Sequence, residues 1–80
     1  MEKIIFEIRN LLDRHSVHHY FDGTLQDVNR PLTYYRFAVQ VLPFDVCKRI
    51  SELEYVKGIL IVHNGTLNQM FLEVTTTNES

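Results

Sequence analysis

Four histidines and one cysteine are the side chains of this 80-residue chain that are best suited to chemistry. His15, His18 and His19 lie close together, and imidazole is both a common metal ligand and a general base. If a helix ends near His15, however, His18 and His19 point to opposite sides of the strand that follows, so the three rings do not converge. Asp13 and Asp22 are nearby but are not at a typical ligand spacing. We therefore expect no metal site and no cofactor, with His63 serving only to cap a turn.

Cys47 is the single cysteine, which excludes an intramolecular disulfide. A nucleophilic cysteine needs an adjacent base. Cys47 is expected in the second turn of a helix beside an apolar stripe, where a buried, unreactive thiol is commoner. His18 or His19 could act with Asp22 or Asp27 in acid–base chemistry, but no spacing supports such a pair. The three glycines form no phosphate-binding loop. The sequence thus favours a protein that is not an enzyme.

Helical periodicity predicts a first helix over residues 2–15. Its apolar stripe is Ile4, Ile5, Ile8, Leu11 and Leu12. Phe6 lies nearly opposite that stripe, either as a single exposed apolar side chain or as an anchor for a partner. Because Ile4, Phe6 and Ile8 also alternate, a strand is the rival interpretation of these residues.

The middle of the chain predicts strands. Residues 17–21 are prone to form a strand, and Asp22-Gly23 is a hairpin dipeptide after which residues 24–28 would pair back. Residues 29–31 form a turn, and residues 32–42 alternate as a strong strand. One face of that strand carries Thr33, Tyr35, Phe37, Val39 and Val41. The other carries Tyr34, Arg36, Ala38 and Gln40.

A second helix is predicted from Pro43 to about residue 54, followed by a hairpin over residues 55–74. Asn64-Gly65 suits a two-residue type I′ turn, which places Val62 opposite Leu67. One face of the hairpin then carries Ile59, Ile61, Met70, Leu72 and Val74. The other carries Leu60, Val62, Leu67 and Phe71, interrupted by Gln69 and Glu73.

These elements predict a single α+β domain over residues 1–80, with residues 75–80 as a frayed tail. The economical packing has two layers, an antiparallel sheet of three to five strands with two helices packed on one face. The rival arrangement has the first helix crossing to the other face, which gives three layers. The predicted core consists of Ile8, Leu12, Phe37, Val39, Ile50, Leu53, Ile59, Ile61 and Leu72.

Charge and composition narrow the classes of function. The net charge is −2 and 45% of residues are hydrophobic, which argues against a polybasic nucleic-acid surface and against disorder. Neither an apolar run long enough to span a membrane nor an export signal is visible, so we expect no membrane and a cytoplasmic location.

We therefore predict a small non-enzymatic binding or regulatory protein. It would present the second sheet face to a protein partner or to a second copy of itself. The predicted binding residues are Tyr34, Arg36, Gln40, Leu60, Val62, Leu67, Phe71 and Phe6. A nucleic-acid-binding module that uses the sheet aromatics and Arg36 is the first alternative, and a histidine-dependent enzyme is the second.

Overall fold

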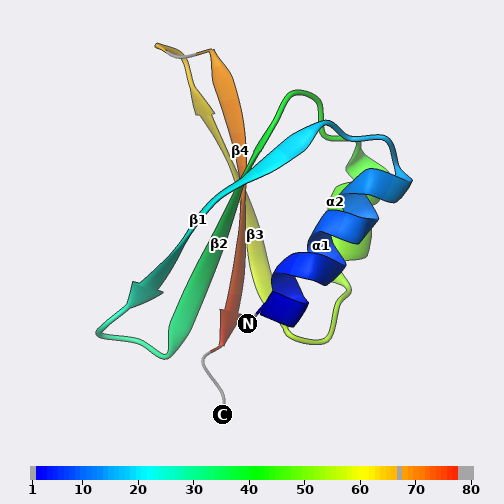
Figure 1. The fold of residues 1–80 in the computed structure, drawn as a ribbon. Coiled ribbons are helices and arrows are strands. Elements are labelled where there is room, and N and C mark those ends of the chain that lie inside the picture. The colour runs from blue at the N-terminus through cyan, green and yellow to red at the C-terminus, as the bar shows by residue number, and fades with distance from the viewer. Residues whose placement is uncertain (1, 67, 78–80) are drawn as a thin grey trace.

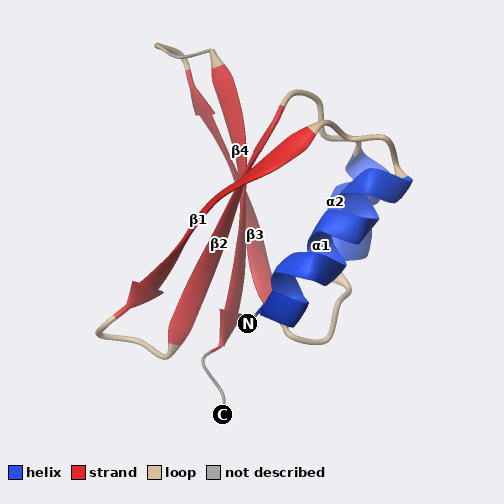
Figure 2. Ribbon diagram, viewed as in Figure 1, coloured by secondary structure: helices blue, strands red, loops and turns tan. Residues whose placement is uncertain are grey.

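A computed structural model describes residues 2–66 and 68–77 of the chain. Its elements follow the order α1 (Glu2–Arg14), β1 (His19–Asp27), β2 (Leu32–Val39), α2 (Phe44–Ser51), β3 (Val56–Asn64) and β4 (Gln69–Thr77). The four strands form an antiparallel sheet in the order β1-β2-β4-β3. Both helices lie on one face of this sheet (Figures 1 and 2). The predicted two-layer α+β fold is therefore confirmed, and the three-layer arrangement is wrong.

The first helix ends in a Schellman motif. Ser16 adopts a left-handed conformation with φ of 57°. Its N–H donates to the Asp13 carbonyl at 3.0 Å, and the N–H of Val17 donates to the Leu12 carbonyl at 2.9 Å. These two bonds satisfy carbonyls that the helix end leaves open. Val17 and Leu12 are both buried, so the motif turns the chain from α1 into β1 over the core.

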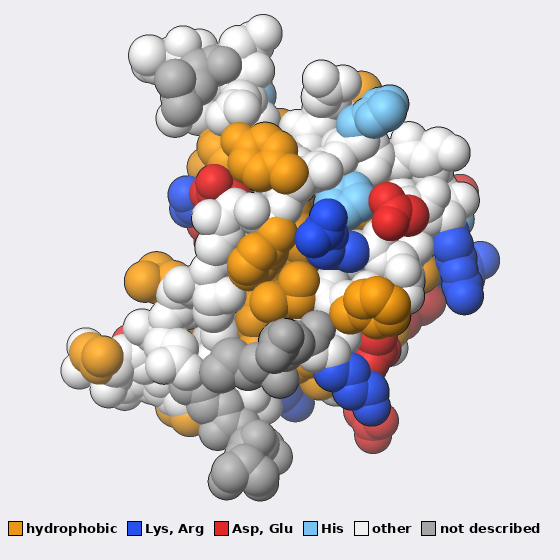
Figure 3. Space-filling view, viewed as in Figure 1, with side chains coloured by type: hydrophobic (Ala, Val, Ile, Leu, Met, Phe, Trp, Pro, Cys, Tyr) orange, Lys and Arg blue, Asp and Glu red, His pale blue; other side chains and the backbone are white. Residues whose placement is uncertain are grey.

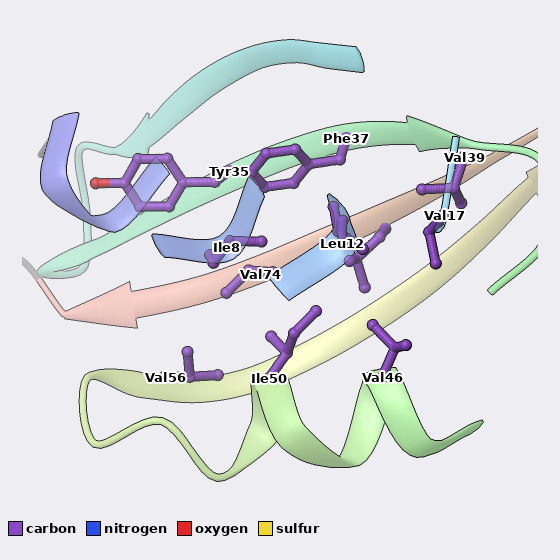
Figure 4. Close-up of a cluster of buried hydrophobic side chains, with 11 residues drawn as sticks. Ile8, Leu12, Val17, Tyr35, Phe37, Val39, Val46, Ile50, Val56 and Val74 are labelled. Atoms are coloured by element: carbon purple, nitrogen blue, oxygen red, sulfur yellow. The ribbon is translucent and has the colours of Figure 1, made fainter. Parts of the chain in front are cut away.

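The core lies between the helices and the sheet (Figure 4). Both helices contribute, α1 through Ile8 and Leu12 and α2 through Val46 and Ile50. Six of the nine predicted core residues are buried, namely Ile8, Leu12, Phe37, Val39, Ile50 and Leu72. Leu53 and Ile59 are partly buried and pack against this cluster.

The prediction for Ile61 is wrong, because this residue is 45% exposed. Its register partner Leu72 lies on the same face and is completely buried. Ile61 is more exposed than Leu72 because α2 is shorter than β3. The 8 residues of α2 span about 12 Å, whereas the 9 residues of β3 span about 30 Å. The helix therefore covers less than half of this edge strand, and the end of the β3–β4 hairpin projects past the helix layer (Figure 1).

The prediction of a type I′ turn at Asn64-Gly65 is also wrong. Asn64 is the last residue of β3 and pairs with Gln69, so the connection between β3 and β4 is longer than a two-residue turn. Neither Asn64 nor Gly65 has a positive φ, whereas Asn68 does, at 52°. Val62 therefore lies opposite Phe71, four residues beyond its predicted partner. A shift by an even number of residues keeps each side chain on its predicted face.

Four other features differ from the predictions. Residues 17–28 do not form a hairpin, because β1 continues through Asp22-Gly23 by means of a bulge and pairs with β2 along its length. Beyond it, β2 ends at Val39 rather than at residue 42, and α2 ends at Ser51. The frayed tail predicted over residues 75–80 starts too early, because residues 75–77 are the last part of β4 and Thr76 is buried; residues 78–80 lie outside the described residues. Across the described residues, no helix is long and apolar enough to cross a membrane.

Candidate functional site

The sheet face opposite the helices, which we call the open face, gathers residues from all four strands. Strand register places three cross-strand rows there: Tyr20, Ala38, Phe71 and Val62; Gly23, Arg36, Glu73 and Leu60; and Leu25, Tyr34, Thr75 and Gly58. Charged side chains gather mainly over the helix layer, while hydrophobic side chains emerge along the sheet (Figure 3).

An ion pair between the two central strands forms the middle of the open face. Arg36 Nε donates to Glu73 Oε2 at 3.1 Å, and Arg36 Nη2 donates to the same oxygen. The guanidinium also lies over the Phe71 ring, 5.1 Å from its centroid. This geometry combines charge-assisted hydrogen bonds with a cation–π contact. The Glu73 side chain is only 17% exposed, whereas that of Arg36 is 44% exposed, so the arginine covers the carboxylate.

Apolar residues surround this centre, and they are buried on the central strands but exposed on the outer strands. Phe71 and Ala38 are buried although the helices lie on the other side of the sheet. The outer strands carry exposed apolar groups instead: Tyr20 is 52% exposed, Leu25 is 68% exposed and Leu60 is 56% exposed. The open face therefore has a packed polar-aromatic centre and an exposed apolar rim.

A shallow hollow of about 270 Å³ lies on this face beside the bulge of β1. Asp22, Gly23 and Leu25 line one side, and Tyr34 and Arg36 line the other, with Thr24 and Glu73 completing it. The bulge creates the hollow because it inserts one extra residue into β1 and bends that strand locally.

Five of the eight predicted binding residues share the open face, namely Tyr34, Arg36, Leu60, Val62 and Phe71. Gln40 lies in a bend just beyond the end of β2, and Leu67 lies outside the described residues. Phe6 is 65% exposed but belongs to α1, in the helix layer.

Sequence reasoning missed Tyr20 and Leu25. Asp22-Gly23 is a typical turn dipeptide, so the sequence predicts a hairpin there and assigns Tyr20 and Leu25 to two different strands. The signal that places them together is an alternation interrupted by one residue: Tyr20 and Leu25 have different parity, and the extra residue at the bulge brings both to the same face.

Three of the histidines line a notch of about 690 Å³ at the end of the sheet where β2 stops pairing with β4. His19 and His63 occupy the two edge strands, with β2 and β4 between them, so their backbones are about 14 Å apart. His18 is the third, and all three also share the notch with Gln69 and Met70. In the described part of the chain, no group of three metal-ligating side chains converges.

His19 is the most buried histidine of the notch, with a side chain that is 3% exposed. Its Nδ1 is 2.9 Å from the Val17 carbonyl oxygen, which can only accept, so Nδ1 carries the proton. The other ring nitrogen, Nε2, has no hydrogen-bond partner among the described residues. The ring packs edge-on to Phe37, with centroids 6.5 Å apart. His19 thus links the end of α1 to the sheet.

Two side chains, Cys47 and Tyr55, have raised pKa values. Burial raises the pKa of the Cys47 thiol, which is opposite to the shift that activates a nucleophilic cysteine. Burial, together with the nearby Glu7 carboxylate, raises the pKa of Tyr55 to about 12. The Tyr55 hydroxyl donates to Glu7 Oε2 at 3.2 Å, which joins α1 to the chain just before β3.

Comparison of this chain with protein-family models, with curated proteins and with solved structures gives no match.

Proposed function

We propose that this chain is a small non-enzymatic binding or regulatory protein whose open face engages a protein, either another chain or a second copy. The observation that carries the proposal is the uncovered face itself. Both helices pack on the opposite side, while Tyr20, Leu25 and Leu60 remain more than half exposed on this side.

The composition of the face supports a protein partner. Protein interfaces are enriched in tyrosine, phenylalanine and arginine, and their energetic centres often hold tyrosine or arginine. Tyr34 precedes Arg36 by two residues on β2, Tyr20 lies on the neighbouring strand β1, and Phe71 lies beneath the guanidinium. The Arg36–Glu73 pair is already formed, so Arg36 is held in place before a partner binds. Such preorganisation lowers the entropic cost of association.

Charge favours a protein over a nucleic acid. Within the register of the described strands, Arg36 is the only cation on the open face, and Glu73 neutralises it. Asp27 on β1 adds a further negative charge to the same face. Binding to nucleic acid relies on several unpaired lysine or arginine side chains that neutralise phosphates. A backbone phosphate would have to displace the Glu73 carboxylate to reach Arg36.

Site-specific photo-crosslinking in the source cell tests the proposal. Tyr20 would be replaced by a photoreactive phenylalanine derivative, since it is aromatic and 52% exposed on the open face. The matched control carries the same group at Phe6, which is 65% exposed in the helix layer. We expect protein adducts from position 20 and none from position 6.

A second pair of variants tests whether the adduct depends on the open face. Leu25→Lys with Tyr34→Lys adds two charges to that face, and Phe6→Lys with Val28→Lys adds two charges elsewhere. The first pair should abolish the adduct and the second should leave it unchanged. Adducts from position 6 alone, or salt-sensitive binding of labelled oligonucleotides by the unmodified protein, would contradict the proposal.

A further inference from the structure

The two edges of the sheet differ in how well they are protected from pairing with another strand. Edge strands expose a row of backbone hydrogen-bonding groups, and natural proteins protect them with bulges, charges or proline. In β1 the bulge at Asp22 interrupts the ladder near the middle of the strand, and Asp27 adds a second charge. The bulge of β3 lies near its beginning, at Lys57, and leaves Gly58–Asn64 in regular register. That stretch contains no charged residue and no proline.

Exposed apolar side chains lie on both sides of this unprotected edge. Leu60 points to the open face and is 56% exposed, whereas Ile61 points to the helix side and is 45% exposed. An additional strand paired with β3 would cover both of these residues, because the side chains of that strand would also alternate between the two faces of the sheet. A partner lying on the open face alone would leave Ile61 exposed.

We propose that β3 pairs with β3 of a second copy, antiparallel and about a two-fold axis at Ile61, to give a continuous eight-stranded sheet. This register pairs the whole Gly58–Asn64 stretch with itself. Ile61 then lies opposite its own equivalent on the helix side, and Leu60 lies opposite Val62 of the other copy on the open side. Every central pair is apolar, and no like charges meet.

The second copy is the preferred occupant because the segment is complementary to itself under this rotation. A two-fold contact uses the same surface on both subunits and closes after two copies. Pairing of β3 with β1 would instead leave a free edge at each end and would grow into a fibre, but the bulge and the acidic residues of β1 oppose it. The assembly is therefore a dimer.

The helix layer supports the same contact. α2 packs against β3, and its first residue, Phe44, is 78% exposed. The two-fold rotation keeps the helices of both copies on one side of the joined sheet, so the two α2 helices flank the axis. A ladder of seven residues is about 24 Å long, which suits a reversible dimer at the low end of interface sizes.

Sedimentation velocity of the purified chain from about 1 µM to 1 mM tests the proposal, because this range brackets weak reversible association. We expect a concentration-dependent monomer–dimer equilibrium. Ile61→Lys should weaken dimerisation at least ~10-fold, since it places two lysines opposite each other. Leu25→Lys on β1 adds the same charge to the other edge strand and should leave the dimer intact.

Disulfide trapping fixes the geometry. In a Cys47→Ser background, Ile61→Cys should give a disulfide-linked homodimer under mild oxidation, whereas Leu25→Cys should stay monomeric. Three outcomes overturn the proposal: a monomer at every concentration, continuous growth beyond the dimer, or a dimer that Leu25→Lys breaks and Ile61→Lys does not. The last would assign self-association to the open face, and adducts at position 20 would still test the proposed function separately.

Discussion

The Arg36–Glu73 pair predicts an asymmetric response to the loss of either partner. Replacing Arg36 by Met removes both hydrogen bonds to Glu73 Oε2 and the contact with Phe71. It leaves a carboxylate whose side chain is 17% exposed without its counter-charge. Loss of charged hydrogen bonds and incomplete solvation of the carboxylate should together lower the free energy of unfolding by about 2–3 kcal/mol.

Removing the acidic partner should cost less. Glu73→Gln keeps the size of the side chain, and the 44% exposed arginine can be solvated by water, so we expect a loss of about 1 kcal/mol or less. In the double variant Arg36→Met/Glu73→Gln, the loss should fall short of the sum by about 1 kcal/mol, the coupling energy of groups in direct contact.

Urea unfolding at pH 7 gives all four free energies, with unchanged m-values as the check that the unfolding transition is the same. Lys57→Met is the matched control, because it removes an exposed cation from the neighbouring edge strand and should change stability by less than about 0.5 kcal/mol. Equal losses from Arg36→Met and Glu73→Gln, or strict additivity in the double variant, would refute the interpretation that the arginine shields a nearly buried carboxylate.

Three further predictions concern stability. Ser16→Gly should stabilise the chain by about 0.5–1 kcal/mol in thermal unfolding, because glycine relieves the left-handed strain at the end of α1. Leu72→Ala should cost about 2–5 kcal/mol and Ile61→Ala about 1 kcal/mol at micromolar concentration, and equal losses would mean that the helices cover both residues. Because the pKa of Tyr55 is raised from 10.0 to about 12, its contribution to stability is complete below pH 10 and is lost as the pH rises towards 12. Stability should therefore fall more steeply between pH 10 and about pH 12 in the wild type than in Tyr55→Phe, and parallel curves would contradict the raised pKa of Tyr55.

The helices and the faces of the strands could be predicted from the sequence because both depend on local periodicity. The stripe containing Ile8 and Leu12 identifies α1 and its buried side. The alternation around Phe37 identifies β2 and both of its faces. The predicted faces of the β3–β4 hairpin are correct although the predicted turn is not. The predicted register is wrong by four residues, and an even shift keeps each side chain on the same face.

The errors come from features that local patterns do not encode. Asp22-Gly23 and Asn64-Gly65 both resemble tight turns, but the first is a bulge inside β1 and the second begins a longer connection. Pairing with β2 determines the first outcome, since it supplies hydrogen bonds to β1 on both sides of the bulge. The exposure of Ile61 depends on the length of α2 relative to β3, which is a property of the tertiary structure.

In the candidate site, too, the faces could be predicted from the sequence, but the contacts between strands could not. Tyr34, Arg36 and Phe71 could be assigned to one face from alternation, but their contact with Glu73 required the pairing of β2 with β4. The partnership of Tyr20 and Leu25 depended on the bulge, and the separation of the histidines depended on the strand order.

Binding of a protein by the open face is tested most directly by the affinity of a purified partner. A protein identified from the adduct at position 20 would be titrated calorimetrically against the wild type and both pairs of lysine variants. Leu25→Lys/Tyr34→Lys should weaken binding at least ~10-fold, or about 1.4 kcal/mol, while Phe6→Lys/Val28→Lys should bind like the wild type. Unchanged affinity of the open-face variant, with its fold intact, would contradict the proposed function.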